Sequence, residues 1–169
     1  MTSRFYQYCK SNIKQKKIQE VSIKTAFTFL AEGKHIVSFV GAGGKSSLID
    51  ATAKWSSSQG KKVLVTTTTH IFRPQDEFLA MNEKQLQEIW AAGHWAVIGA
   101  TEEKDPQKLK MPELDWMRQA MELSDLVLIE ADGSKRLPCK VPDDHEPVLL
   151  PESDIVVAVL GLSALGRSL

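Results

Sequence analysis

His35-Ile-Val-Ser-Phe-Val-Gly-Ala-Gly-Gly-Lys-Ser46 joins an apolar run to a cluster of glycines, a lysine and a serine. The run from His35 to Val40 is rich in β-branched residues and ends in glycines, which is typical of a buried strand. The segment from Ser46 to Ser58 contains several apolar residues and is followed by Gly60, a pattern that predicts a helix. A strand, a glycine turn and a helix in this order predict the first unit of an α/β fold.

Apolar runs and helical segments alternate along the rest of the chain. Further strands are predicted at residues 62–66, 94–98, 125–130 and 154–160, and helices at residues 23–32, 82–92 and 112–123. Strands that are apolar throughout and separated by helices are typical of a parallel sheet covered on both faces. We therefore expect a doubly wound, mainly parallel sheet of about five strands. The four tryptophans lie on these elements and are predicted to be core residues: Trp55, Trp90, Trp95 and Trp116.

The composition excludes several classes of protein. The 169 residues, 43% hydrophobic and 25% charged, suffice for one soluble domain with a hydrophobic core. Lys plus Arg and Asp plus Glu both number 21, so the net charge is zero, which disfavours a nucleic-acid-binding protein. No apolar run approaches the roughly 20 residues that span a bilayer. The N-terminus lacks the apolar segment of a secretion signal, and the two cysteines fit no disulfide framework. We expect a cytoplasmic protein.

The charges are unevenly distributed along the chain. Residues 1–24 contain six basic residues and one acidic residue, whereas residues 75–125 contain eleven acidic and five basic residues. We interpret residues 1–20 as a basic N-terminal arm and residues 21–169 as the folded domain. A doubly wound fold normally covers its last strand with a following helix. Because the sequence stops soon after residues 154–160, we expect a missing C-terminal element and exposed apolar surface beside that strand.

The glycine cluster has the properties of a phosphate-binding loop. Glycine lets backbone N–H groups approach an anion, and the helix N-terminus adds partial positive charge. Lys45 would contact the β- and γ-phosphates, and the Ser46 hydroxyl would bind Mg²⁺. The match to G-x-x-x-x-G-K-[ST] is incomplete, because Phe39 occupies the position of the first glycine. The predicted nucleotide-binding residues in this segment are Gly41, Ala42, Gly43, Gly44, Lys45, Ser46 and Ser47.

Two other predicted strands end in polar residues that would face the same crevice. The strand at residues 62–66 runs into four threonines, of which Thr68 and Thr69 would lie near the γ-phosphate; continuation of a β-branched strand is the alternative. The strand at residues 125–130 ends in Glu130-Ala-Asp132, and carboxylates at such a tip hold Mg²⁺ or orient the nucleophile. The sequence thus predicts Ser46, Glu130 and Asp132 as metal ligands, and Lys45, Glu130 and Asp132 as catalytic residues.

A basic cluster follows the acidic strand tip. Lys135, Arg136 and Lys140 would bind a phosphorylated or carboxylated second substrate, with His145 as a further candidate; solvated surface charge is the alternative. Four of the seven prolines lie between Leu137 and Pro151, which predicts an extended loop in this region.

Five ordered motifs resemble those of the YqeC family. They lie at residues 40–47, 65–71, 129–138, 145–147 and 161–166 and include Val-Thr-Thr-Thr-Thr-His-Ile71, Ile-Glu-Ala-Asp-Gly-Ser-Lys-Arg-Leu-Pro138 and His-Glu-Pro147. The family is described as P-loop nucleotide-binding accessory proteins that mature selenium- and molybdenum-dependent hydroxylases. The resemblance implies a three-layer α/β/α fold like that of P-loop NTPases, bound ATP or GTP with Mg²⁺, and such a hydroxylase or its cofactor as partner.

The leading hypothesis is a magnesium-dependent nucleotide-binding protein, an NTPase that serves as an accessory factor for these hydroxylases. The guanine-reading Asn/Thr-Lys-x-Asp signature is absent from the sequence, which favours ATP over GTP. One alternative is a small-molecule kinase or nucleotidyltransferase that acts on a pterin-like or acidic substrate. Another is a non-catalytic module that binds phosphate or nucleotide. The sequence is compatible with a homo-oligomer and leaves the oligomeric state open.

Overall fold

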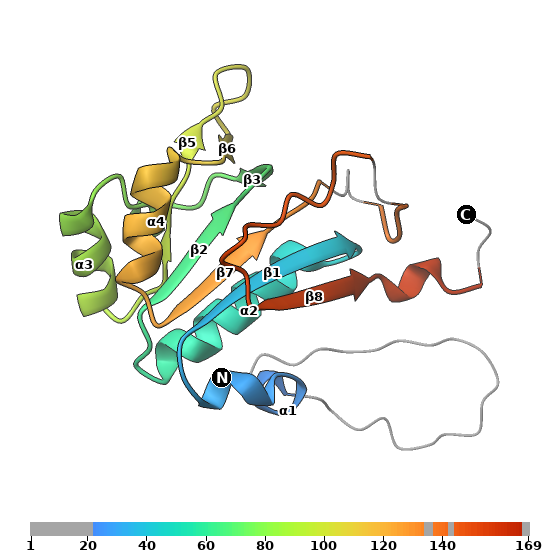
Figure 1. The fold of residues 1–169 in the computed structure, drawn as a ribbon, viewed down its shortest axis with the longest axis horizontal. Helices are drawn as coiled ribbons and strands as arrows, with labels where there is room; N and C mark the ends of the chain where they lie inside the picture. Colours follow the sequence, from blue (N-terminus) through green and yellow to red (C-terminus); the bar gives the residue numbers. More distant parts are fainter. Residues whose placement is uncertain (1–21, 134–136, 142–143, 167–169) are drawn as a thin grey trace.

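The computed structural model describes residues 22–133, 137–141 and 144–166, which form a parallel α/β fold (Figure 1). The main sheet has five strands in the order β4-β2-β7-β1-β8, and all its strand pairs are parallel. The strands are β1 (His35–Ala42), β2 (Val63–Thr67), β4 (Ala96–Val97), β7 (Leu126–Glu130) and β8 (Ile155–Leu160). The predicted fold class is confirmed. The predicted basic arm at residues 1–20 lies outside the described residues.

Three helices and two core clusters make the fold three-layered. The helices are α2 (Lys45–Ser58), α3 (Glu83–Ala91) and α4 (Leu114–Glu122). Side chains alternate between the two faces of a strand. Accordingly, Val63 and Val65 of β2 join one cluster with Ile49 of α2, whereas Leu64 joins a second cluster with α3 and α4 residues such as Met117. The sheet is therefore covered by α2 on one face and by α3 and α4 on the other (Figure 1).

The helix predicted at residues 23–32 is broken into two short pieces. These are α1 (Ile23–Ala26), whose N-terminus the Ser22 side chain caps, and the 3₁₀ turn η1 (Thr28–Ala31). Phe27 between them has non-helical backbone angles, φ −125° and ψ 71°. Its ring lies edge-on against Phe39, with centroids 6.4 Å apart. Packing of this ring on the sheet outweighs the continuation of the helix.

A small antiparallel sheet was not predicted. It consists of β3 (His70–Phe72), β5 (Ala100–Thr101) and β6 (Lys108–Lys110), with β6 in the middle. It lies near the carboxyl end of β2 (Figure 1). Strands of two or three residues are too short to produce an alternating pattern. The other 3₁₀ turns are η2 (Asp76–Phe78) and η3 (Leu162–Ala164).

The edge strand β8 packs against the core with one face only, and the residues of that face are half-buried. Its residues Ile155, Val157 and Val159 pack on the α2-side core, whereas Val156 and Leu160 are 50% and 56% exposed. The expected exposed apolar surface beside the last strand is therefore present. Among the described residues, none of the helices combines the length and the hydrophobicity needed to cross a membrane.

Candidate functional site

The glycine cluster forms a sharp turn between β1 and α2. Gly41, Gly43 and Gly44 have φ values of 93°, 85° and 117°, which side-chain-bearing residues rarely adopt. A Cβ on Gly43 would overlap the Gly161 backbone and lie 2.6 Å from the Pro138 carbonyl oxygen. A Cβ on Gly44 would meet no atom within 4 Å. The loop is therefore packed closely at Gly43 and open at Gly44.

The N-terminus of α2 follows the glycine turn directly. Gly44 precedes the 14-residue helix, none of the described side chains caps it, and its first turn contains no acidic residue. The first N–H groups of a helix lack partners within the helix and carry partial positive charge. An anion at this turn would therefore meet backbone donors as well as the open space over Gly44.

Lys45, the first residue of α2, is buried in an ion pair with Asp132. Its Nζ lies 2.8 Å from Asp132 Oδ1 and 3.8 Å from Glu130 Oε1, and the side chain is 1% exposed. The same ammonium group donates to the Gly41 carbonyl oxygen at 2.6 Å. The Gly41 N–H in turn donates to Asp132 Oδ2 at 2.6 Å. Asp132 thus accepts from a loop N–H and pairs with the lysine, two donors that a bound phosphate would also use.

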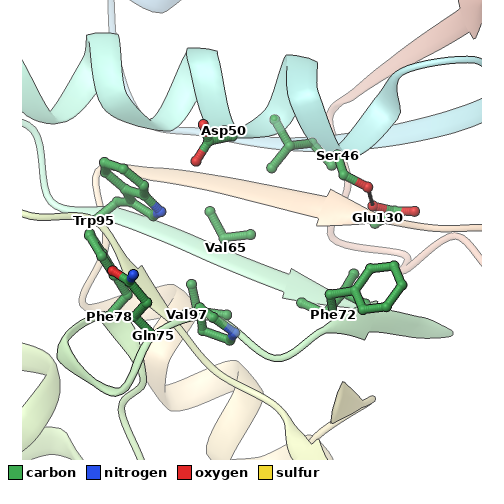
Figure 2. Close-up of a pocket in the computed structure, with 12 residues that line it drawn as sticks. Ser46, Asp50, Val65, Phe72, Gln75, Phe78, Trp95, Val97 and Glu130 are labelled. Atoms are coloured by element: carbon green, nitrogen blue, oxygen red, sulfur yellow. Dashed lines mark hydrogen bonds between the residues drawn. The ribbon is translucent and has the colours of Figure 1, made fainter. Parts of the chain in front are cut away.

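Ser46 lies against the second carboxylate of the strand tip. Its hydroxyl donates to Glu130 Oε2 at 2.9 Å (Figure 2). The register places Glu130 at the end of β7 between Phe39 of β1 and Thr67 of β2, directly beside the loop. Burial raises the pKa of Glu130, and the hydrogen bond from Ser46 and the charge of Lys45 oppose this rise in part. Glu130 is therefore easier to protonate than an ordinary glutamate.

The predicted metal ligands divide into two groups. The adjacent oxygens of Ser46 and Glu130 suit a hard cation such as Mg²⁺. Asp132 instead pairs with Lys45. Within the described ranges, no three His, Cys, Asp or Glu side chains are grouped to hold a metal ion. Mg²⁺ does not need such a group, because it is commonly held by one or two carboxylates, waters and substrate phosphates.

The threonine segment is positioned by hydrogen bonds within the protein. Thr67 Oγ1 donates to the Glu130 carbonyl oxygen at 2.8 Å, and Thr68 Oγ1 donates to the Val148 carbonyl oxygen at 2.7 Å. The Thr69 N–H donates to Thr67 Oγ1 at 2.9 Å. Thr68 therefore holds the loop after residue 144 in place. Thr68 and the half-buried Thr69 both border a cleft of about 420 Å³, together with His145. Contact of either threonine with a phosphate stays a prediction.

Lys140 is paired within the site. Its ammonium group donates to the Gly133 carbonyl oxygen at 2.6 Å and to the Glu146 carboxylate, and lies 3.6 Å from Asp132 Oδ2. Burial lowers the pKa of Lys140, but these acidic partners outweigh it and raise the pKa above its usual value. The same contact lowers the pKa of Glu146. The predicted substrate-binding residues Lys135 and Arg136 lie outside the described residues.

Sequence reasoning missed an apolar pocket that adjoins Ser46 and Glu130. This pocket, of about 320 Å³, lies between α2 and the segments that carry β3, η2 and β4 (Figure 2). Trp95 was predicted as a core residue, and it does pack on the core, but it also lines the pocket. The sequence pattern does not distinguish an aromatic residue that only packs in the core from one that also borders a pocket.

Comparison with known proteins supports the resemblance drawn from the motifs. Residues 37–169 match the family model described as YqeC protein. The uncharacterized protein YqeC of Escherichia coli (strain K12) is 36% identical over 146 residues, which represent 78% of this chain and 53% of that protein. The chain thus spans about half the length of this curated relative. No solved structure matches the chain.

Proposed function

The chain belongs to the YqeC family, and from this premise we propose that it is a Mg²⁺-dependent nucleotide-binding protein that hydrolyses a phosphoanhydride bond. One observation carries the proposal. Lys45 and Ser46 begin a helix that no described side chain caps. Lys45 contacts Asp132, two residues beyond the end of β7, and Ser46 contacts Glu130 at its end. A nucleoside triphosphate and its metal ion are commonly held by these groups: a lysine, a hydroxyl, backbone N–H donors and carboxylates.

Each of these groups has a distinct role in the proposal. The N–H groups at the start of α2 and the Lys45 ammonium group hold the phosphates. Ser46 and Glu130 hold Mg²⁺, which neutralises charge on the phosphates when it is bound. Phosphate oxygens then replace the Asp132 carboxylate as the partner of Lys45 and of the Gly41 N–H. The released Asp132 carboxylate orients a water molecule. ATP is the preferred nucleotide, because the guanine-reading signature is absent from the sequence.

Replacement of Lys45 by methionine tests the phosphate contact. Charge-assisted hydrogen bonds contribute about 1.5–3 kcal/mol, so Lys45→Met is expected to weaken MgATP binding about 10- to 150-fold. Isothermal titration calorimetry with MgATP measures the change. Absence of MgATP binding by the wild type, or equal affinity in the variant, would disprove the proposal.

A milder pair of variants separates binding from folding. Ser46 is exposed, so Ser46→Ala should fold normally and lose mainly the Mg²⁺ dependence of nucleotide binding. Ser58→Ala, an exposed serine at the other end of α2, should behave like the wild type. Equal Mg²⁺ dependence in the two variants would argue against Ser46 as a metal ligand.

The pH dependence of Mg²⁺ binding tests the role of Glu130. A proton competes with the cation for this carboxylate, and burial raises its pKa above that of an ordinary glutamate. Mg²⁺ affinity should therefore fall as the pH is lowered, beginning at a higher pH than for an ordinary glutamate. Mg²⁺ titrations of the ATP complex from about pH 5 to about pH 8 measure this. Glu130→Gln should reduce the pH dependence to the part that the nucleotide phosphates contribute by themselves, whereas Glu102→Gln should retain all of it.

A phosphotransferase is the second candidate function, favoured by the pocket beside Ser46 and Glu130. Turnover of ATP only to free phosphate would favour the NTPase, whereas tight binding without turnover would favour a non-catalytic module. The family resemblance adds the proposal of an accessory role in the maturation of selenium- or molybdenum-dependent hydroxylases. Loss of hydroxylase activity in cells that lack the protein, restored by the wild type and not by Lys45→Met, tests this role.

A further inference from the structure

The pocket of about 320 Å³ extends from the proposed metal site into an apolar region. Ser46 and Glu130 lie at one end, and Trp95 and Phe78 close the other (Figure 2). This volume lies within the range of small-molecule sites, which are mostly apolar with a few polar groups. Its position beside the strand tip makes it a candidate site for a second ligand.

The aromatic side chains favour a flat ligand. The rings of Phe78 and Trp95 are stacked, with centroids 4.6 Å apart and an interplanar angle of 30°. Phe72, which is 58% exposed, lines the pocket near Glu130 (Figure 2). Aromatic rings placed in this way offer faces and edges on which a planar ring packs well.

The charge of the lining restricts the ligand further. In the described part of the chain, two carboxylates, Asp50 and Glu130, line the pocket, and no lysine, arginine or histidine does. An anionic ligand would be repelled by these carboxylates. Since Glu130 is assigned to the metal ion, amino groups or ring N–H groups of the ligand would find their acceptor in Asp50. The Gln75 amide adds a donor and an acceptor. The pocket therefore suits a neutral or cationic ring that carries hydrogen-bond donors.

We propose that this pocket binds a planar, amino-substituted heteroaromatic ligand at the same time as the nucleotide. The simultaneous binding rests on the proposed function, because Ser46 and Glu130 are assigned there to the metal ion at the β- and γ-phosphates. The base of a nucleotide lies at the opposite end of its phosphate chain. A ring in this pocket therefore belongs to a second molecule.

Fluorescent 2-aminopurine serves as the probe for this pocket. We expect the full chain to bind it saturably and to quench its fluorescence by stacking. Loss of an aromatic partner costs about 1–3 kcal/mol per stacked base, so Phe72→Ala and Trp95→Ala should weaken binding about 5- to 150-fold. Met81→Ala, a change at an equally exposed apolar residue outside the pocket, should leave binding unchanged. Naphthalene-2-sulfonate, which is flat and anionic, should not compete.

Addition of saturating MgATP distinguishes the second-ligand site from a nucleobase site. Unchanged or tighter 2-aminopurine binding supports the proposal. Displacement of the probe by MgATP, with MgATP binding weakened by Trp95→Ala, would assign the pocket to the nucleobase and overturn it. Absence of probe binding by the wild type would also overturn it. Probe binding that persists in a protein without measurable MgATP affinity would refute the proposed function and the simultaneous binding, but not the pocket's ligand class.

Discussion

Asp132→Ala is expected to lower the free energy of unfolding by about 3–5 kcal/mol, which is the typical cost of removing one partner of a buried ion pair. Lys45 is 1% exposed, and its closest carboxylate oxygen belongs to Asp132. The variant also leaves the Gly41 N–H without the acceptor that it has at 2.6 Å. The remaining carboxylate, Glu130, lies 3.8 Å from the Lys45 ammonium group and compensates only in part. Chemical denaturation measures the loss.

Two further variants show whether the ion pair causes this loss. The double variant Lys45→Met, Asp132→Ala should be less destabilised than the sum of the single changes, because no unpaired lysine remains. Asp76→Ala breaks an ion pair with Arg73 whose carboxylate is 89% exposed, and it should leave the midpoint almost unchanged. Additive effects of the two single changes would show that Lys45 and Asp132 do not stabilise each other.

Anions should partly rescue Asp132→Ala if the loop binds phosphate. The variant vacates the position beside Lys45 and the Gly41 N–H, so inorganic phosphate is expected to raise the melting temperature of Asp132→Ala more than that of the wild type. Sodium chloride at equal ionic strength is the control for screening. Equal shifts for phosphate and chloride would indicate that these two donors do not form an anion site.

The sequence predicted that these strand ends lie together because parallel strands end at the same edge of a sheet. The glycine turn, the threonines and Glu130 are found together for this reason, and the register of β7 with β1 and β2 places them. The partner of Asp132 was not predictable from spacing. Residues two positions apart on an extended chain share a face, so the spacing predicts that Glu130 and Asp132 point the same way. However, β7 ends at Glu130, and Asp132 accepts a hydrogen bond from the glycine loop.

The apolar pocket was beyond sequence reasoning for a different reason. Its lining comes from segments far apart in the chain, such as Ile49 on α2, Val65 on β2, Phe78 on η2 and Trp95 before β4. Each of these residues has the sequence signal of an ordinary core residue. Only the packing of β3 and η2 beside α2 leaves space between them. The short strands that organise this region give no periodic pattern to detect.

Gly43→Ala is expected to destabilise the protein by about 2–5 kcal/mol, from backbone strain together with overpacking. The φ of 85° disfavours any side chain. The added methyl group would also overlap the Gly161 backbone and approach the Pro138 carbonyl oxygen, which itself accepts the Gly161 N–H at 2.8 Å. Because the obstacle is backbone, it cannot be relieved by a side-chain rotation. The loop and the segments at residues 138 and 161 would have to separate, and MgATP binding should weaken as well.

Gly60→Ala isolates the strain from the overlap. Gly60 has nearly the same φ, 83°, but a Cβ there meets no atom within 4 Å. This change should cost only the left-handed backbone strain, about 1–2 kcal/mol, and leave nucleotide binding intact. The excess loss in Gly43→Ala then measures how tightly residues 138 and 161 hold the glycine turn. Equal losses in the two variants would mean that the contact with residues 138 and 161 adds no strain of its own.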